Sequence, residues 1–122
     1  NGDMVGHTGI LEAAIVAAEA VDSCLGRLAT AVTEVGGVLL VTADHGNCEM
    51  MINPTLDEPH TAHTTNMVPV VMVDAPSWVH GLRDGRLCDV APTVLRLMGL
   101  EQPAEMTGGS LINDGGAETV TA

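Results

Sequence analysis

The stretch Gly36-Gly37-Val38-Leu39-Leu40-Val41-Thr42-Ala43-Asp44-His45-Gly46 decides the fold. Its centre, residues 38–42, is a short unbroken apolar run that is rich in β-branched side chains. The glycine pair before the run and the polar residues after it mark the two ends of a strand. A continuous apolar run, without alternating polar residues, is typical of a strand that is buried on both faces. We therefore predict a buried strand over residues 38–42.

A long helix is predicted immediately before this strand. Between residues 10 and 35, apolar side chains recur at steps of three or four, which places them in one stripe on a helix. Glu12 lies in the expected first turn, where a negative charge suits the helix dipole, and Gly36-Gly37 ends the helix. We expect the stripe to pack on the sheet, so that helix and strand together indicate α/β architecture. The stripe consists of Leu11, Ala14, Ala18, Val21, Leu25, Leu28, Val32 and Val35.

The rest of the chain is expected to complete a single structural unit, because it contains no internal repeat and no independent linker. Residues 52–66 lack a hydrophobic period and are predicted to form a loop, crossed by a short hairpin. Residues 68–73 form a second predicted strand, and Asp89 is expected to cap a helix that runs to Gly99. The tail from Glu101 is rich in glycine and is predicted to be irregular, with frayed last residues.

Composition excludes two classes of function. The 122 residues contain 16 Asp and Glu against four Arg, which gives a formal net charge of −12. A chain without a basic surface is not expected to bind nucleic acid. It also contains no apolar run of about 18 residues, so no membrane span is predicted.

The cysteines and the amino-terminal residues indicate the setting of the chain. Cys24, Cys48 and Cys88 are odd in number and widely spaced, which fits a reducing compartment and predicts a cytoplasmic protein. The polar, glycine-rich beginning has neither a signal peptide nor an initiating Met. Because the chain also has few large side chains for a core, we expect it to be an incomplete unit of a longer protein.

Histidine and carboxylate side chains gather in three places. In open α/β sheets, ligands bind at the carboxyl ends of strands, and one of the three places directly follows the predicted buried strand. Carboxylate oxygens and imidazole nitrogens suit Mn²⁺, Zn²⁺, Fe²⁺ or Co²⁺ better than Ca²⁺. Each place alone also has a structural interpretation, as a solvated turn, a helix N-cap or a loop. Combined, they favour a site for two metal ions, which would give an acidic chain a means to bind an anionic substrate. The three places are Asp3 with His7, Asp44 with His45, and His60 with His63.

These places lie in stretches that resemble the cofactor-independent (2,3-bisphosphoglycerate-independent) phosphoglycerate mutases, a family of the alkaline phosphatase superfamily. The similarity extends over nearly the whole chain. It implies that residues 1–122 are the carboxyl-terminal portion of the metal-binding phosphatase domain, a partial alkaline-phosphatase-like three-layer sandwich. The stretches are Asp3-Met4-Val5-Gly6-His7-Thr8-Gly9, Thr42-Ala43-Asp44-His45-Gly46-Asn47, His60-Thr61-Ala62-His63-Thr64-Thr65-Asn66, Leu11-Glu12-Ala13-Ala14, Asp89-Val90-Ala91-Pro92-Thr93 and Gln102-Pro103-Ala104-Glu105-Met106-Thr107-Gly108.

The resemblance implies an isomerase that interconverts 3-phosphoglycerate and 2-phosphoglycerate through a phosphoserine, with two Mn²⁺ ions or else Co²⁺, Zn²⁺ or Fe²⁺. The nucleophilic Ser, a further Asp ligand and the groups that hold the substrate are implied to lie outside this chain. We therefore predict that the isolated chain lacks mutase activity, and that the full-length protein is monomeric. The resemblance assigns one metal to Asp3, His7 and His63 and the other to Asp44 and His45, with His60 beside the site. Asn47 and Glu49, which follow Asp44 and His45 in the chain, are expected to orient the ligands or the loop.

Two positions depart from the family pattern, and other functions stay open. Gly2 and Met67 each stand where the family usually has Pro, which is expected to loosen loops next to the predicted ligands. The alternatives are another phosphomutase or phosphodiesterase of the same superfamily, and a metal-binding fragment without catalysis. Residues 42–47 and 103–108 argue against the first alternative. The acidity also fits an adaptation to high salt, which is compatible with every one of these functions.

Overall fold

The chain, seen in a computed structural model that describes residues 2–115, divides into two compact units. The first comprises Asn1–Asp74 and the second Ala75–Ala122. The expectation of a single unit is therefore wrong. Each strand pair among the described residues joins two strands of the same unit. Asp74, at the boundary, adopts a left-handed backbone conformation with φ 56°, a turn geometry that short polar residues tolerate.

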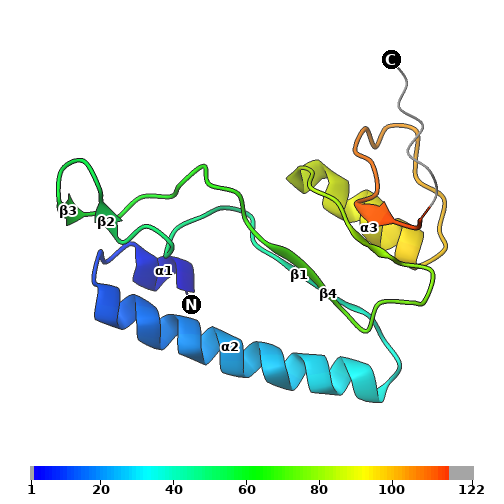
Figure 1. Cartoon of the computed structure of the whole chain (residues 1–122), viewed down its shortest axis with the longest axis horizontal. Coiled ribbons are helices and arrows are strands. Elements are labelled where there is room, and N and C mark those ends of the chain that lie inside the picture. The colour runs from blue at the N-terminus through cyan, green and yellow to red at the C-terminus, as the bar shows by residue number, and fades with distance from the viewer. Residues whose placement is uncertain (1, 116–122) are drawn as a thin grey trace. The chain divides into compact units, whose positions relative to one another are not determined.

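The first unit contains two helices and four short strands (Figure 1). β1 and β4 pair antiparallel, with Leu39 opposite Val73 and Thr42 opposite Val70, and β2 and β3 form a hairpin. The predicted long helix, the two strands and the hairpin are confirmed, whereas the short helix that carries Asp3 was not predicted. The elements are α1 (Gly2–Gly6), α2 (Leu11–Glu34), β1 (Leu39–Thr42), β2 (Ile52–Asn53), β3 (Glu58–Pro59) and β4 (Val70–Val73).

Both ends of α2 follow from local sequence. Ile10, just before the helix, is extended, and its N–H donates to the Thr8 hydroxyl over 3.2 Å. At the other end Gly36 adopts φ 69°, and the N–H of Gly37 turns back to donate to the Val32 carbonyl. A left-handed glycine of this kind is the common way to end a helix, so the predicted stop is confirmed.

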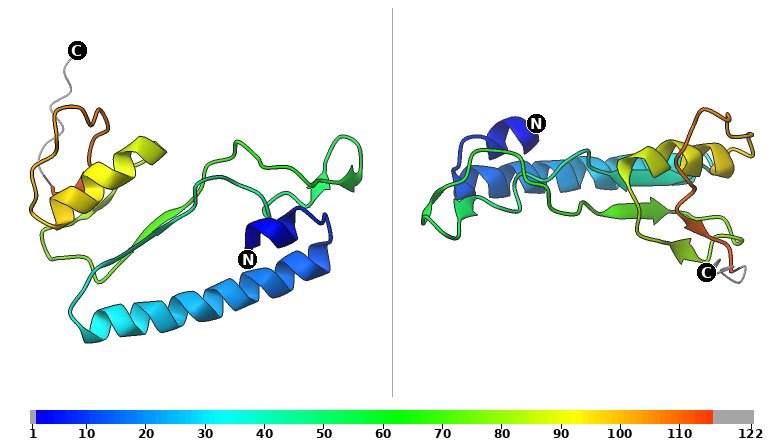
Figure 2. Two further views of the ribbon diagram at one scale, coloured as in Figure 1. Left: turned by 180° about the vertical axis from the view of Figure 1, so that it is seen from behind. Right: turned by 90° about the horizontal axis from the view of Figure 1, so that it is seen from above.

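The predicted burial of α2 and β1 is wrong for the described residues. Ala14 is the buried residue of α2, whereas Val21 and Leu28 of the stripe are 44% and 54% exposed. β1 is only half-buried. The reason is geometric, because a 24-residue helix is about 36 Å long whereas a four-residue strand spans about 13 Å. α2 extends far beyond the β1–β4 pair at its N-terminal end, where α1 lies beside it (Figure 2).

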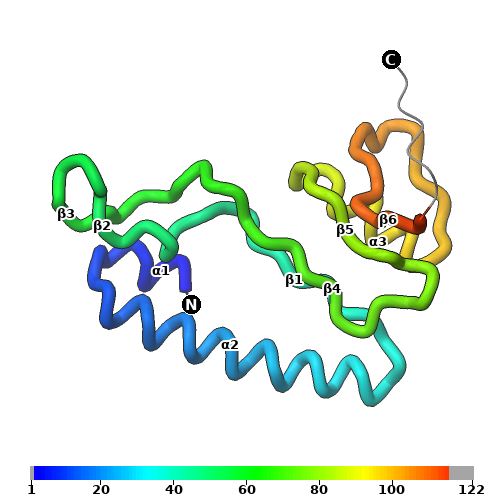
Figure 3. Tube along the Cα trace, viewed as in Figure 1, coloured from blue at the N-terminus to red at the C-terminus, as the bar shows by residue number. Residues whose placement is uncertain are grey.

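The second unit contains a short helix and a two-stranded ladder. It contains β5 (Gly81–Leu82), η1 (Leu87–Asp89), α3 (Val90–Leu97) and β6 (Ile112–Asn113), whose path Figure 3 traces. β6 pairs antiparallel with β5, so the tail is not wholly irregular as predicted. A two-residue strand is too short to leave a hydrophobic period in the sequence. The predicted fraying concerns residues 116–122, which lie outside the described residues.

Asp89 performs a different task from the one predicted. It is the residue before α3, but its carboxylate caps no N–H of that helix. Instead it accepts the backbone N–H groups of Arg86 and Gly109, each over 2.8 Å. The cause is the 3₁₀ turn η1, which already gives Asp89 a helical backbone.

Within residues 2–115, no helix is long and apolar enough to cross a membrane.

Candidate metal centre

Three predicted ligands from distant parts of the first unit converge on one point. Nε2 of His63 lies 3.0 Å from Oδ1 of Asp3 and 3.1 Å from Nε2 of His7, and the third side of this triangle, His7 to Asp3, measures 3.4 Å. α1 supplies Asp3, the turn after it supplies His7, and the loop between β3 and β4 supplies His63. All three side chains are exposed enough to meet an ion from solvent.

The spacing of these three atoms fits a single transition-metal ion. Ligands bound at about 2.0–2.2 Å with angles between about 90° and 110° are separated from one another by roughly 3 Å. The three measured separations of 3.0, 3.1 and 3.4 Å agree with adjacent positions around one such ion. The donor set, one carboxylate oxygen and two imidazole nitrogens, is also appropriate for Mn²⁺, Co²⁺ or Zn²⁺.

The tautomer of His7 is fixed by the backbone. Its Nδ1 lies 2.6 Å from the carbonyl oxygen of Thr61. A carbonyl oxygen can only accept, so Nδ1 must carry the proton and donate it. Nε2 is then the ring nitrogen left to bind a metal ion, and it faces Asp3 and His63. Metal-ligating histidines are usually oriented by this kind of bond from the other ring nitrogen.

Asp44 and His45 lie directly beside the triangle. Nε2 of His45 is 3.6 Å from Oδ1 of Asp44 and 3.8 Å from Oδ1 of Asp3. The ring of His45 stacks on that of His63, with the ring centroids 3.6 Å apart. Asp3, His7, His45 and His63 thus lie together, and Asp44 adjoins them through its neighbour His45. Their assignment to two metal ions stays a prediction.

Asn47 connects the segment after β1, which carries Asp44 and His45, to α1, which carries Asp3. Its side-chain amide donates to Oδ1 of Asp3 over 3.0 Å and to the Asp3 carbonyl over 3.2 Å. This hydrogen bond is the main cause that lowers the pKa of Asp3, and the hydrogen bond from His63 and the charges of His7 and His63 lower it further against the opposing effect of desolvation. Asp3 is therefore an ionised carboxylate at neutral pH, as a metal ligand must be.

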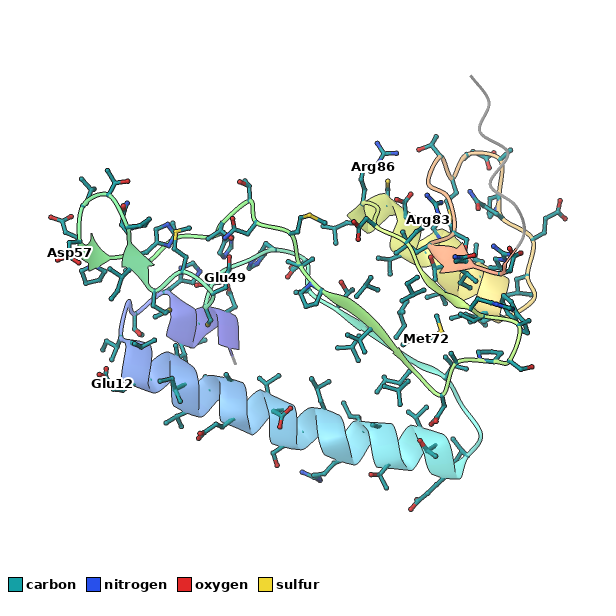
Figure 4. The ribbon with its side chains drawn as sticks, in the orientation of Figure 1. Glu12, Glu49, Asp57, Met72, Arg83 and Arg86 are labelled. Carbon is teal, nitrogen blue, oxygen red and sulfur yellow. The ribbon has the colours of Figure 1, made fainter. Side chains whose placement is uncertain are left out.

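Glu49 ties the loop that carries His63 to the segment after β1. Its Oε1 accepts the Thr64 hydroxyl and, over 2.9 Å, the side-chain amide of Asn66, while Oε2 accepts the Asn47 N–H over 2.6 Å. These hydrogen bonds, with Thr64 the largest contributor, lower the pKa of Glu49 to about 2. Glu49 lies close to α1 (Figure 4).

The remaining candidate, His60, is not in the cluster that the structure assembles from the described residues. Its backbone N–H pairs with Met51, and its buried Nδ1 has no hydrogen-bond partner there. Sequence reasoning gave no role to Thr61, Thr64 or Asn66, although each contacts the site. The one feature of the sequence that could have indicated these residues is that they are short polar residues within three positions of the predicted ligand His63.

An open pocket of about 320 Å³ adjoins the predicted ligands. Asp3, Asp44 and His45 line one side of it, and the chain leading into β4, including Met67, lines another. The ligand atoms on this wall are therefore accessible to a small molecule from solvent.

Comparison with known proteins places the chain in a family. The model of the metalloenzyme superfamily matches residues 1–102. The chain therefore belongs to the metalloenzyme superfamily. Its curated relatives within that superfamily are named 2,3-bisphosphoglycerate-independent phosphoglycerate mutase. The protein of that name from Ruegeria pomeroyi is 64% identical over 92% of this chain, and the one from Rhodopirellula baltica is 60% identical over the whole chain.

A solved structure confirms the expected fold class. The phosphoglycerate mutase of Leishmania mexicana, determined at low cobalt concentration, superposes with a TM-score of 0.79 and 37% identity over 93% of this chain. The chain spans about 22% of the length of the curated relatives and 24% of the solved one. The resemblance seen in the sequence is confirmed, and the chain corresponds to only part of the alkaline-phosphatase-like fold.

Proposed function

We propose that the chain supplies five metal ligands of a phosphoglycerate mutase that interconverts 3-phosphoglycerate and 2-phosphoglycerate. The observation that carries the proposal is the triangle of Asp3, His7 and His63, with Asp44 and His45 at its side. Relatives at 60–64% identity bear the name of this enzyme. The three free cysteines fit the proposed cytoplasmic location.

In this proposal the residues of the chain hold and orient two divalent ions, which we take to be Mn²⁺. Asp3, His7 and His63 hold one, and Asp44 and His45 contribute to the other. When bound, such ions lower the pKa of a serine hydroxyl and offset the charge of a phosphoryl group during transfer. The chain itself keeps Asp3 ionised through Asn47 and presents Nε2 of His7 through the Thr61 carbonyl.

The proposal assigns the serine nucleophile and the groups that bind the phosphoglycerate to the rest of a longer protein. The chain's described residues contain no second cluster of this type, and its four arginines are few for a phosphorylated substrate. The isolated 122 residues are accordingly expected to bind metal without turning over phosphoglycerate.

A chimaeric enzyme tests the proposal. The matching segment of the Ruegeria pomeroyi protein is replaced by residues 1–122, and the interconversion of the two phosphoglycerates is measured with Mn²⁺ present. We expect an active chimaera, and a loss of activity of at least about 100-fold in the Asp44→Asn and His63→Gln versions.

The His80→Gln chimaera is the matched control, because His80 is an exposed histidine of the other unit. An inactive but folded chimaera, or a ligand variant as active as the His80→Gln control, would contradict the proposal.

A further inference from the structure

Glu49 carries a carboxylate for which the proposed function has no use. Its three hydrogen-bond donors come from two segments. Thr64 and Asn66 lie 15 and 17 residues after Glu49, in the loop that carries His63, and Asn47 lies two residues before Glu49. Thr64 follows the predicted ligand His63 in the chain. Asn47 donates in turn to Asp3. The Glu49 side chain therefore links the segments that carry the predicted ligands. It reaches the segment of His63 through Thr64 and the segment of Asp3 through Asn47.

The same two segments are also joined by backbone. The N–H of Thr64 donates to the Gly46 carbonyl over 2.9 Å, which forms an isolated bridge between them. A Cβ atom on Gly46 would collide with the Thr64 hydroxyl and with the Glu49 carboxylate. The approach of the loop to the end of β1 is thus close enough to require glycine. One backbone hydrogen bond joins Thr64 to Gly46, so the side-chain bonds to Glu49 add to what fixes the loop there.

A carboxylate is the side chain that suits this place. Its two oxygens accept hydrogen bonds from three donors. Oε1 accepts from both Thr64 and Asn66, and Oε2 accepts from the Asn47 N–H. Glutamine would present an amide N–H₂ to one of these donors, and alanine would leave all three without a partner. Charged acceptors also form stronger hydrogen bonds than neutral ones.

We propose that Glu49 is a positioning residue of the metal centre, which fixes the loop bearing His63 against the segments bearing Asp44, His45 and Asp3. This inference rests on the proposed function, because the centre it positions is the one proposed above. Glu49 itself lies outside the ligand triangle and is not expected to bind the ion.

The test uses the 122-residue chain, its Glu49→Ala and Glu49→Gln variants, and Glu58→Ala as the matched control. Glu58 is an exposed glutamate of the same unit whose side chain forms no hydrogen bond among residues 2–115. Two quantities are measured in each protein. The first is the hydrogen-exchange rate of the Thr64 amide without metal, and the second is the affinity for Co²⁺, followed by its visible absorption.

We expect Glu49→Ala to accelerate exchange of the Thr64 amide about tenfold or more, because the Thr64 and Asn66 side chains then lose their common acceptor beside the backbone bridge. Its affinity for Co²⁺ should fall by about 10- to 100-fold, the usual cost of losing a partner that orients ligands. Glu49→Gln should lie between Glu49→Ala and the wild type. Glu58→Ala should stay within about twofold of the wild type in both measurements.

The proposal is overturned if Glu49→Ala exchanges the Thr64 amide at the control rate, or if it binds Co²⁺ as tightly as the control with the same absorption bands. If Glu49→Ala does not fold by circular dichroism, Thr64→Val decides instead, since it removes one hydroxyl and keeps the backbone bridge. Equal exchange and equal affinity in Thr64→Val and the wild type would then reject the proposal. A wild-type chain that takes up no Co²⁺ would contradict the proposed function, whereas the exchange rates would still decide the role of Glu49.

Discussion

At the residue scale, the centre depends on side chains and glycines that let three loops approach closely. Nδ1 of His7 donates to the Thr61 carbonyl, and the side-chain amide of Asn47 donates to Asp3 while lying against Gly6. A side chain at position 6 would collide with the Asn47 amide. The ligand atoms are therefore preorganised by their neighbours, which reduces the ordering that metal binding requires.

Gly46→Ala is expected to destabilise the first unit. The new Cβ would meet the Thr64 hydroxyl and the Glu49 carboxylate, so the loop must move away at a cost of about 1–3 kcal/mol in the free energy of unfolding. Urea unfolding followed by circular dichroism measures this.

Gly26→Ala is the matched control for Gly46→Ala. Gly26 lies in α2 with nothing within 4 Å of the added Cβ, so alanine should stabilise the helix by about 0.5–1 kcal/mol. The close approach at position 46 would be refuted if both substitutions changed the stability equally.

The stability that Glu49 contributes should depend on pH in a defined direction. Its pKa is lowered from 4.5 to about 2 in the folded chain. A lowered folded pKa means that the contribution is complete above the unfolded pKa and is lost as the pH falls toward the folded one. The difference in unfolding free energy between the wild type and Glu49→Gln should thus be constant above about pH 5 and shrink as the pH falls toward 2. Urea titrations at several pH values measure it.

Glu58→Gln provides the reference for this pH dependence. It removes the same charge at an exposed position, so its difference from the wild type should change little over the same range. A pH-independent difference for Glu49→Gln would argue against the ionised hydrogen-bond network.

The position of some of these residues could be predicted from the sequence, and that of others could not. Asp44 and His45 directly follow an apolar run, so their place at a strand end follows from local pattern. The contacts of Glu49 with Thr64 and Asn66 depend on how two irregular loops approach each other. No hydrophobic period or turn signal encodes that approach, so the sequence predicts that Glu49 orients the ligands or the loop but not which residues it contacts.

At the element scale, boundaries were more predictable than burial. α2 was predicted over residues 10–35 and extends over Leu11–Glu34, because its stripe and its glycine stop are local features. Whether the stripe is covered depends on the surfaces available to it, and a pair of four-residue strands offers little. β6 was not predicted for a similar reason, because a two-residue strand is defined by its partner, and its partner β5 lies 30 residues away in the chain.

The second unit depends on one buried hydroxyl. The Thr93 hydroxyl is fully buried, donates to the Asp89 carbonyl over 2.7 Å and accepts the Leu111 N–H over 2.8 Å. It thus joins α3 to the segment that leads into β6. Thr93→Val keeps the shape but leaves a buried N–H without a partner, which should cost about 2–3 kcal/mol of stability.

Thr93→Ser is the informative comparison, because serine keeps both hydrogen bonds and loses only a methyl group. It should cost about 1 kcal/mol. Thermal unfolding of the two variants measures the order. If serine proved more destabilising than valine, packing of the methyl group, and not the hydrogen bonds, would hold these segments together.

At the scale of the whole molecule, charge dominates. Sixteen acidic residues face four arginines, and α2 alone carries Glu12, Glu19, Asp22 and Glu34 with Arg27 as its only base. Like charges repel one another more strongly in the compact state than in the unfolded chain, so a large net charge lowers stability. The five predicted ligands include two of these acids, which divalent ions would neutralise locally.

Salt should therefore stabilise the chain in the absence of metal. Raising NaCl from 0.01 M to 1 M shortens the screening length from about 30 Å to about 3 Å, which removes most repulsion between exposed carboxylates. We expect the thermal midpoint to rise by about 4 °C for each kcal/mol of repulsion that is relieved. The double variant Glu19→Gln/Asp22→Asn removes two exposed acids that lie three residues apart on α2, where like charges destabilise a helix. It should start with a higher midpoint at low salt and gain less from added NaCl. If the wild type and the double variant gained equally, the effect of salt would come from strengthened apolar burial and not from charge screening.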